Sequence, residues 1–140
     1  MRFMMIVKAN QESEAGAMPD EKALAAMGKY NEELAKAGVL LDLTGLTPSS
    51  QGVRVRFSAG GKRKVIDGPF TEAKELVAGY WLIQVKSKEE AIEWARRCPC
   101  PSEGEGDIEI RPLFDVTDFP AASAETLATA AAIEQQIRKS

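Results

Sequence analysis

The chain contains no histidine among its 140 residues, and this absence excludes several kinds of chemistry. Histidine is the base of Ser-His-Asp and Cys-His sites, a common zinc and haem ligand, and the side chain that titrates near neutral pH. Catalysis would have to use Asp, Glu, Lys, Tyr, Cys or Arg. Cysteine is also scarce, because Cys98 and Cys100 are the only two. Their Cys-x-Cys spacing fits neither a redox pair nor a zinc site, so we expect reduced thiols, no metal centre and no cofactor.

An excess of basic residues and long apolar runs are missing as well. The chain has 18 basic and 21 acidic residues, a net charge of −3, so a nucleic-acid partner is not expected. Its apolar stretches are a few residues long, far below the ~20 that span a bilayer, and the first residues are too few for a secretory signal. We therefore expect a cytoplasmic protein with no membrane partner.

The residues that are present predict alternating strands and helices. Apolar periodicity and flanking turn residues indicate the segments that follow. Strands are expected at 3–7, 39–46, 77–85 and 107–114, a hairpin at 53–57 and 63–66, and helices at 20–36, 88–98 and 123–139. Residues 10–14 and 99–106 are expected to be polar connections, and Pro112 indicates that the last strand ends early or lies at an edge. We divide the chain into a domain at 1–119 and a helical tail at 120–140.

This order of elements predicts an α+β, ferredoxin-like fold with an inserted β-hairpin and a C-terminal helix. Both main helices would lie on one face of an antiparallel sheet. The strands at 3–7, 39–43 and 77–85 are apolar at successive positions, whereas a face exposed to water should carry polar residues at alternate positions. The second face therefore needs an apolar cover. A second copy of the same sheet, packed face to face in a homodimer, is the simplest cover.

One stretch of sequence resembles a known family. The run from Asp67 to Val85, DGPFTEAKELVAGYWLIQV, and the helix KEEAIEWA that follows it are similar to the bacterial DGPF family, a branch of the YCII-related proteins. The resemblance extends from Met4 to Phe114 and implies a dimeric α+β barrel. It implies little about activity, because DGPF proteins are largely uncharacterised, although some related genes lie beside extracytoplasmic-function sigma factors. The His-Asp pair suspected in YCII enzymes is impossible here, since the histidine position falls at about Met27.

Asp67 is the main candidate site residue, and two roles are open for it. The carboxylate can accept backbone N–H groups of the turn that follows, as a structural Asx-turn, or it can face a ligand as a catalytic acid or base. The turn is the commoner role for an aspartate in this position. Two roles are also open for Lys74 and Glu75. They form a solvated charged pair, or they point with Asp67 into a cleft.

Two arginines and several aromatic residues complete the candidates. Arg54 and Arg56 are two apart on a predicted strand, so they share a face that either binds an anionic ligand or pairs with glutamates of a neighbouring strand. Pairing is the commoner outcome. Tyr30 and Trp81 either line a pocket between helix and sheet or belong to the core. The core is the usual place for an aromatic residue on an apolar stripe.

Two functions remain open from the sequence. The first is a homodimeric module that binds a small molecule or a protein, with the sigma-factor link that the family context suggests. The second is an enzyme whose cleft at the dimer interface uses Asp67 as general acid or base, with Arg54, Arg56, Lys74 or Tyr80 stabilising an anion. Of the two, we favour the module.

Overall fold

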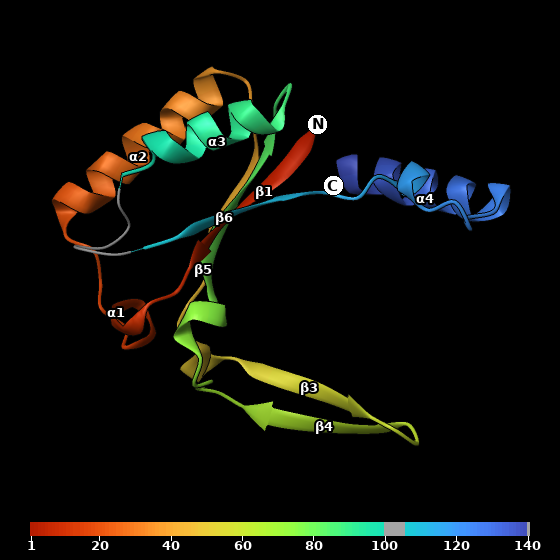
Figure 1. Cartoon of the computed structure of the whole chain (residues 1–140), viewed down its shortest axis with the longest axis horizontal. Helices are drawn as coiled ribbons and strands as arrows, with labels where there is room; N and C mark the ends of the chain where they lie inside the picture. Colours follow the sequence, from red (N-terminus) through yellow and green to blue (C-terminus); the bar gives the residue numbers. More distant parts are fainter. Residues whose placement is uncertain (100–105, 140) are drawn as a thin grey trace.

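The computed structural model describes residues 1–99 and 106–139. The fold is built on a four-stranded antiparallel sheet (Figure 1). The strands lie in the order β2-β5-β1-β6. Their bounds are β1 Arg2–Lys8, β2 Leu40–Gly45, β5 Val77–Gln84 and β6 Ile108–Pro112. The predicted α+β, ferredoxin-like arrangement is confirmed. β6 lies at an edge and ends at Pro112, as the proline indicated.

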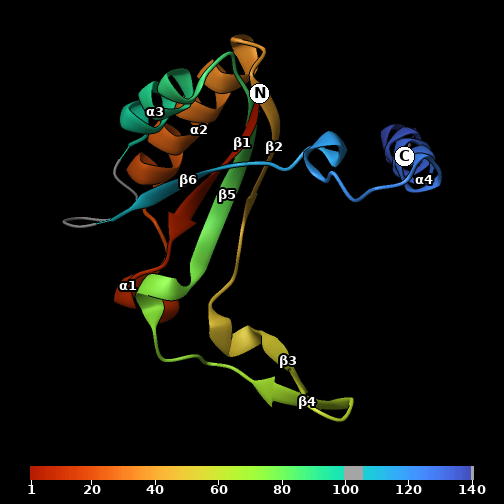
Figure 2. The same cartoon turned by 45° about the vertical axis from the view of Figure 1, so that its right-hand side comes forward.

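Two helices cover one face of this sheet (Figure 2). They are α2 (Glu21–Lys36) and α3 (Lys88–Arg97). Each begins at a side-chain cap: the Asp20 carboxylate accepts the N–H of Ala23 at 2.8 Å, and the Ser87 hydroxyl accepts the N–H of Glu90 at 3.1 Å. Such caps satisfy backbone donors that the first turn of a helix leaves unpaired. Gly38, with φ of 74°, supplies the left-handed residue after α2.

The core lies between these helices and the sheet. Its members are fully or nearly buried and come from both layers: Phe3, Met5, Tyr30, Leu34, Val39, Trp81, Ile83, Val85, Ala91 and Trp94. Burying one large side chain of this kind contributes roughly 1.5–3 kcal/mol. The Tyr30 and Trp81 rings meet edge to face at 5.6 Å, so both are core residues.

The opposite face of the sheet, here called the open face, is also apolar at its centre. Met4, Ile6, Tyr80 and Leu82 alternate with the buried residues of β1 and β5 and are half-buried. The register places Met4 beside Leu82 and Ile6 beside Tyr80. Polar side chains on the outer strands flank this centre: Asp42, Thr44, Glu109 and Arg111. The open face therefore has an apolar middle and a polar margin.

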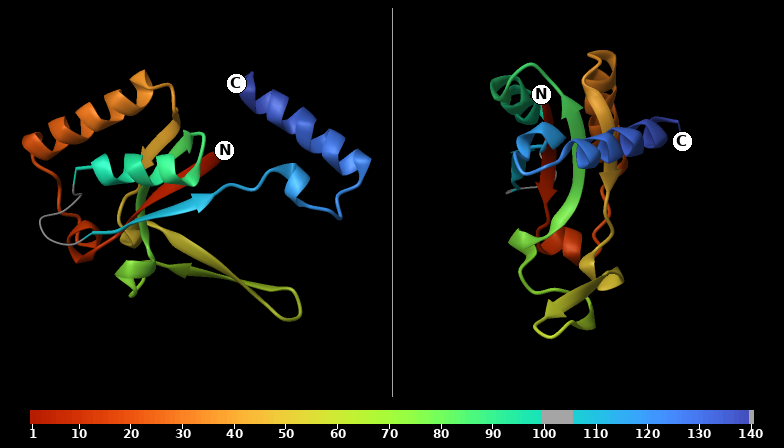
Figure 3. Two further views of the ribbon diagram at one scale, coloured as in Figure 1. Left: turned by 45° about the horizontal axis from the view of Figure 1, so that its top comes forward. Right: turned by 90° about the vertical axis from the view of Figure 1, so that its right-hand side faces the viewer.

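A β-hairpin and a C-terminal helix project from the sheet (Figure 3), on the side of the open face (Figure 2). β3 (Val53–Ser58) and β4 (Lys62–Asp67) form a separate two-stranded sheet, and their turn holds Gly60 and Gly61 at φ of 82° and 77°. The register leaves Ala59, Gly60 and Gly61 in the turn, and glycine adopts the positive φ of the last two positions at no steric cost. The predicted hairpin is thus confirmed. The 3-10 turn η3 (Val116–Asp118) leads into the helix α4 (Ala124–Arg138).

Of the two segments predicted as polar connections, one contains a helix and the other lies mostly outside the described residues. Residues 10–14 are not a loop, because Gln11–Glu14 forms the short helix α1. Asn10 accepts the N–H of Ser13 at 2.8 Å, and the Ser13 hydroxyl accepts the N–H of Asn10 at 3.0 Å, so the two residues close a reciprocal cap. Most of the predicted 99–106 connection, with Cys100, lies outside the described residues. Among the helices that the structure describes, none is long and apolar enough to cross a membrane.

Candidate functional site

The Asp67-Gly68-Pro69-Phe70 turn follows β4 and closes the base of the hairpin. The Gly68–Pro69 peptide bond is cis, and the N–H of Gly68 donates to the carbonyl oxygen of Gly52 at 2.9 Å. A Cβ atom at Gly68 would lie 1.8 Å from the carbonyl oxygen of Ser49, which is far inside van der Waals contact. Glycine is therefore required at this position by the close approach of two backbone segments.

Glu14 and Ser49 hold this turn against the rest of the molecule. Ser49 begins the 3-10 turn η1 (Ser49–Gln51), and its N–H donates to Glu14 Oε2 at 2.8 Å. The Ser49 hydroxyl also donates to Glu14 Oε1 and accepts the N–H of Phe70 at 3.0 Å. One carboxylate thus links α1, η1 and the turn. The network is part-buried and satisfied, so its role is to fix the direction in which the hairpin leaves the sheet.

Asp67 does not form the Asx-turn that its position predicted. Its side chain is exposed, and it makes no hydrogen bond or ion pair with any other residue that the structure describes. The turn is held by Ser49 and Gly52 instead, which supply the acceptors for Phe70 and Gly68. Asp67 pairs with Val53 across the hairpin, so its carboxylate stands on the same face as that valine.

Arg54 and Arg56 share the other face of the hairpin, but the expected glutamate partners are not there. The residues opposite them are Ile66 and Lys64. Arg54 places its guanidinium 3.7 Å above the centre of the Phe70 ring, a cation–π contact that ties the hairpin to its base. Arg56 faces Lys64, and like charges opposite each other on a hairpin repel. Among the residues that the structure describes, neither arginine forms the expected ion pair with a glutamate.

Lys74 and Glu75 lie in the 3-10 turn η2 (Ala73–Glu75), between the DGPF turn and β5. Both side chains are exposed, and they form no ion pair with each other or with other described residues. The backbone carbonyl of Glu75 accepts a long hydrogen bond of 3.5 Å from Lys8 Nζ. In the single chain these two side chains are solvated.

Tyr80 lies on the open face and is joined there to a residue that the sequence analysis did not single out. Its hydroxyl donates to Asp42 Oδ2 at 3.3 Å. The other carboxylate oxygen, Oδ1, accepts the N–H of Leu43 at 2.8 Å, which fixes the orientation of Asp42. The β2–β5 register is irregular between Leu40 and Asp42, and this irregularity places Asp42 on the open face beside Leu82. The sequence carried no signal for that shift.

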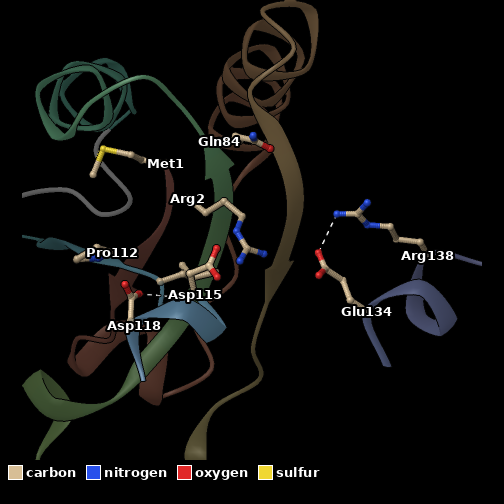
Figure 4. Close-up of a pocket in the computed structure, with 9 residues that line it drawn as sticks. Met1, Arg2, Gln84, Pro112, Asp115, Asp118, Glu134 and Arg138 are labelled. Atoms are coloured by element: carbon tan, nitrogen blue, oxygen red, sulfur yellow. Dashed lines mark hydrogen bonds and ion pairs between the residues drawn. The ribbon is translucent and has the colours of Figure 1, made fainter. Parts of the chain in front are cut away.

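An open cavity of about 520 Å³ lies between the sheet end and α4 (Figure 4). Arg2 and Asp115 line one side of it, and the ion pair of Glu134 with Arg138 (2.8 Å) lines the other. Two hydrogen bonds from Thr117 and the nearby charge of Arg2 lower the pKa of Asp115. None of the residues predicted from the sequence as site residues is among those that line this cavity.

A buried titratable group lies elsewhere in the core. Tyr30 donates its hydroxyl to the carbonyl oxygen of Trp94 at 2.6 Å, and burial raises the pKa of this phenol well above its usual range. Tyr30 is thus held neutral and structural. Over the described residues, no group of three or more acidic or cysteine side chains is arranged to hold a metal ion.

Comparison with known proteins decides the family. The YCII-related domain matches residues 1–117. The chain belongs to the YCII-related domain family. This YCII-related chain is also 34% identical to an uncharacterized protein of Rhizobium meliloti (strain 1021), over 94 residues that cover 67% of the chain and 75% of that protein. The position expected for the family histidine, Met27, is half-buried and packs against the core, so no polar group stands in for the missing base there.

Proposed function

We propose that this YCII-related protein is a homodimeric module that binds a small ligand at the open face of its sheet. The observation that carries the proposal is the pattern of that face, which α2 and α3 leave uncovered. Met4, Ile6 and Leu82 form an apolar centre, and charged residues lie only at its margin. Interfaces between protein chains have the same anatomy, with an apolar core and a polar rim.

A second copy of the sheet fits this surface better than solvent does. The half-buried centre is continuous across β1 and β5, and two such sheets can pack face to face at about 10 Å. The polar margin would then remain near water at the edges of the interface. This supports the dimer that the strand pattern predicted.

The Tyr80–Asp42 pair gives the ligand site its chemistry. It adjoins the apolar centre, and Asp42 is already oriented by the N–H of Leu43. A carboxylate in this setting accepts donors, so we propose a ligand that binds at the margin of the dimer interface and presents an amine or hydroxyl to Asp42. Tyr80 would donate to or accept from the same ligand through its hydroxyl.

An enzyme that uses Asp67 is the second candidate, and one observation favours it. The Asp67 carboxylate has no hydrogen-bond or ion-pair partner among the described residues, so it is available to a substrate. Such an enzyme would need a partner chain that closes a cleft over Asp67, because catalysis requires the carboxylate to lie within hydrogen-bond reach of a bound substrate. A link to sigma-factor regulation stays a prediction from the family resemblance.

The test is a thermal-shift screen against metabolites, run beside light scattering. We expect a dimer at micromolar concentration and a ligand that raises the melting temperature of the unmodified chain. That shift should be lost in Tyr80→Phe and Asp42→Asn, whereas Asp67→Asn should keep it. Leu82→Arg places a charge in the middle of the open face and should give a folded monomer.

Each part of the proposal has its own negative result. A monomer in the unmodified chain at micromolar concentration would contradict the dimer. A ligand shift that disappears in Asp67→Asn and persists in Tyr80→Phe would move the site to the hairpin base. Turnover of the ligand that needs Asp67 would establish the enzyme in place of the module.

A further inference from the structure

Two projecting segments of the chain bury little of their apolar surface. The hairpin arm is β3, β4 and their turn, residues 53–67, and the C-terminal arm is residues 113–139. Both lie on the side of the open face (Figure 2). They leave opposite ends of the sheet, because the hairpin precedes β5 whereas the C-terminal arm follows β6, and β5 and β6 run in the same direction.

The hairpin arm carries an exposed apolar face. Val53, Val55, Phe57 and Val65 share this face and are 58%, 48%, 68% and 63% exposed. The arm is a separate two-stranded sheet, and an isolated two-stranded hairpin is marginally stable in water. A stable hairpin of this composition needs a surface against which its valines and phenylalanine can pack.

The C-terminal arm has the same need. Phe114 and Phe119 stack on each other at 4.8 Å but remain 74% and 49% exposed, and Ile133 and Ile137 are 53% and 67% exposed. All residues of α4 are described, and none of them is buried. A 15-residue helix without packing is marginal in water, so α4 also lacks the contact that would stabilise it.

The charges of the two arms are complementary. The hairpin arm holds five basic side chains and one acidic one, a net charge of +4: Arg54, Arg56, Lys62, Arg63, Lys64 and Asp67. The C-terminal arm holds four acidic side chains: Asp115, Asp118, Glu125 and Glu134. Its two basic side chains are its last two residues, and one of them, Arg138, is already paired with Glu134. The register places Arg63 and Asp67 on the apolar face and the other four basic side chains on the opposite face. The charges therefore attract the positive hairpin arm to the negative C-terminal arm as whole segments, and like arms repel each other.

We propose that the hairpin arm of each protomer docks on the C-terminal arm of a second copy, so that the dimer is closed by two reciprocal clasps. This rests on the proposed face-to-face dimer. When the two-fold axis runs across the strands, it exchanges the ends of the sheet and brings each hairpin arm to the partner's C-terminal arm. Each contact occurs twice, as an isologous interface requires.

Charge reversal tests the clasp in the full-length chain. The first variant is Lys62→Glu with Arg63→Glu and Lys64→Glu, the second is Glu125→Lys with Glu134→Lys, and the third combines all five changes. We expect each of the first two to raise the dimer Kd about tenfold or more at low salt, and the combined chain to return near the original Kd. Sedimentation equilibrium measures all four proteins, and added salt should reduce the differences.

A matched control separates the position of the charge from the net charge. Lys22→Glu, Lys29→Glu and Lys88→Glu reverse three exposed lysines outside the arms, and this variant should keep the original Kd. Far-UV circular dichroism checks that every variant remains folded. All reversed side chains are exposed, so the fold should be preserved.

The outcomes distinguish the clasp from the dimer itself. A dimer that dissociates in Leu82→Arg but keeps its Kd in both single-arm variants would overturn the clasp and leave the face-to-face dimer standing. The reversals take the hairpin arm from a net charge of +4 to −2 and the C-terminal arm from −2 to +2. Docking of like arms would therefore lower the Kd of the first variant and leave that of the second unchanged, and either result counts against the clasp. An original chain that is monomeric would overturn both proposals.

Discussion

The two faces of the central sheet differ in what covers them, although they alternate along the same strands. On the face beneath α2 and α3, Phe3, Met5 and Ile83 are 1%, 0% and 0% exposed. On the open face their sequence neighbours Met4 and Leu82 are only half-buried. One strand therefore supplies the folding core with one set of residues and the proposed dimer interface with the alternate set. Residues one position apart should respond differently to the same substitution.

The largest expected difference is between Ile83→Ala and Leu82→Ala. Ile83 is fully buried, so its truncation should lower the free energy of unfolding by about 3–4 kcal/mol through lost burial and a cavity. Leu82→Ala should lower the free energy of unfolding by about 1 kcal/mol in dilute protein, and it should weaken the proposed dimer. Urea unfolding and sedimentation measure the two effects. Equal losses of stability in dilute protein would mean that the faces do not differ as described.

Substitution at the base of the hairpin arm should destabilise the fold, although the arm itself is exposed. Gly68→Ala places a methyl group against the carbonyl of Ser49 and should cost about 2 kcal/mol. Gly28→Ala is the matched control, because nothing lies within 4 Å of its new methyl group in α2. That change should stabilise the protein by up to about 1 kcal/mol. If Gly68→Ala is neutral in urea unfolding, the close packing of the turn is disproved.

The smallest expected effect is the difference in stability between Tyr30→Phe and Tyr80→Phe. These two tyrosines lie on opposite faces of the sheet. Tyr30→Phe removes a buried hydroxyl that donates to Trp94 and should cost about 1 kcal/mol. Tyr80→Phe removes a longer bond on the open face and should change stability by less than about 0.5 kcal/mol. Chemical unfolding at pH 7 compares the two.

Alkaline pH sharpens the same contrast. The folded chain raises the pKa of Tyr30, so this phenol stabilises the fold fully below the usual tyrosine pKa of about 10, and the stabilisation declines as the pH rises beyond it. The slope from this one group reaches about 1.4 kcal/mol per pH unit. Tyr30→Phe should lose that component of the pH dependence between pH 9 and 11. An unchanged slope in Tyr30→Phe would show that Tyr30 is not the group responsible.

Much of the fold is predictable because its signals are local. The caps at Asp20 and Ser87, the glycines of the hairpin turn and the apolar period of each strand all act within a few residues. The helix α1 was missed because its cap pairs Asn10 with a serine at the third position, where a glutamate or glutamine is the usual signal.

The site was less predictable because its geometry depends on contacts between distant residues. Ser49 binds Glu14, which is 35 residues away, and this contact decides how the DGPF turn is held without the Asp67 side chain. Arg54 finds an aromatic ring in place of the expected carboxylate. Asp42 reaches the open face only through an irregular register. Neither composition nor periodicity contains these pairings.

The positions of the two tryptophans decide what fluorescence can report on this protein. Trp81 and Trp94 are 5% and 9% exposed and both belong to the core beneath the helices. Their emission will follow loss of that core during denaturation, whereas the proposed docking of the arms should leave it unchanged. An indole introduced by Phe57→Trp, at the 68% exposed tip of the hairpin, would give the missing optical signal for assembly.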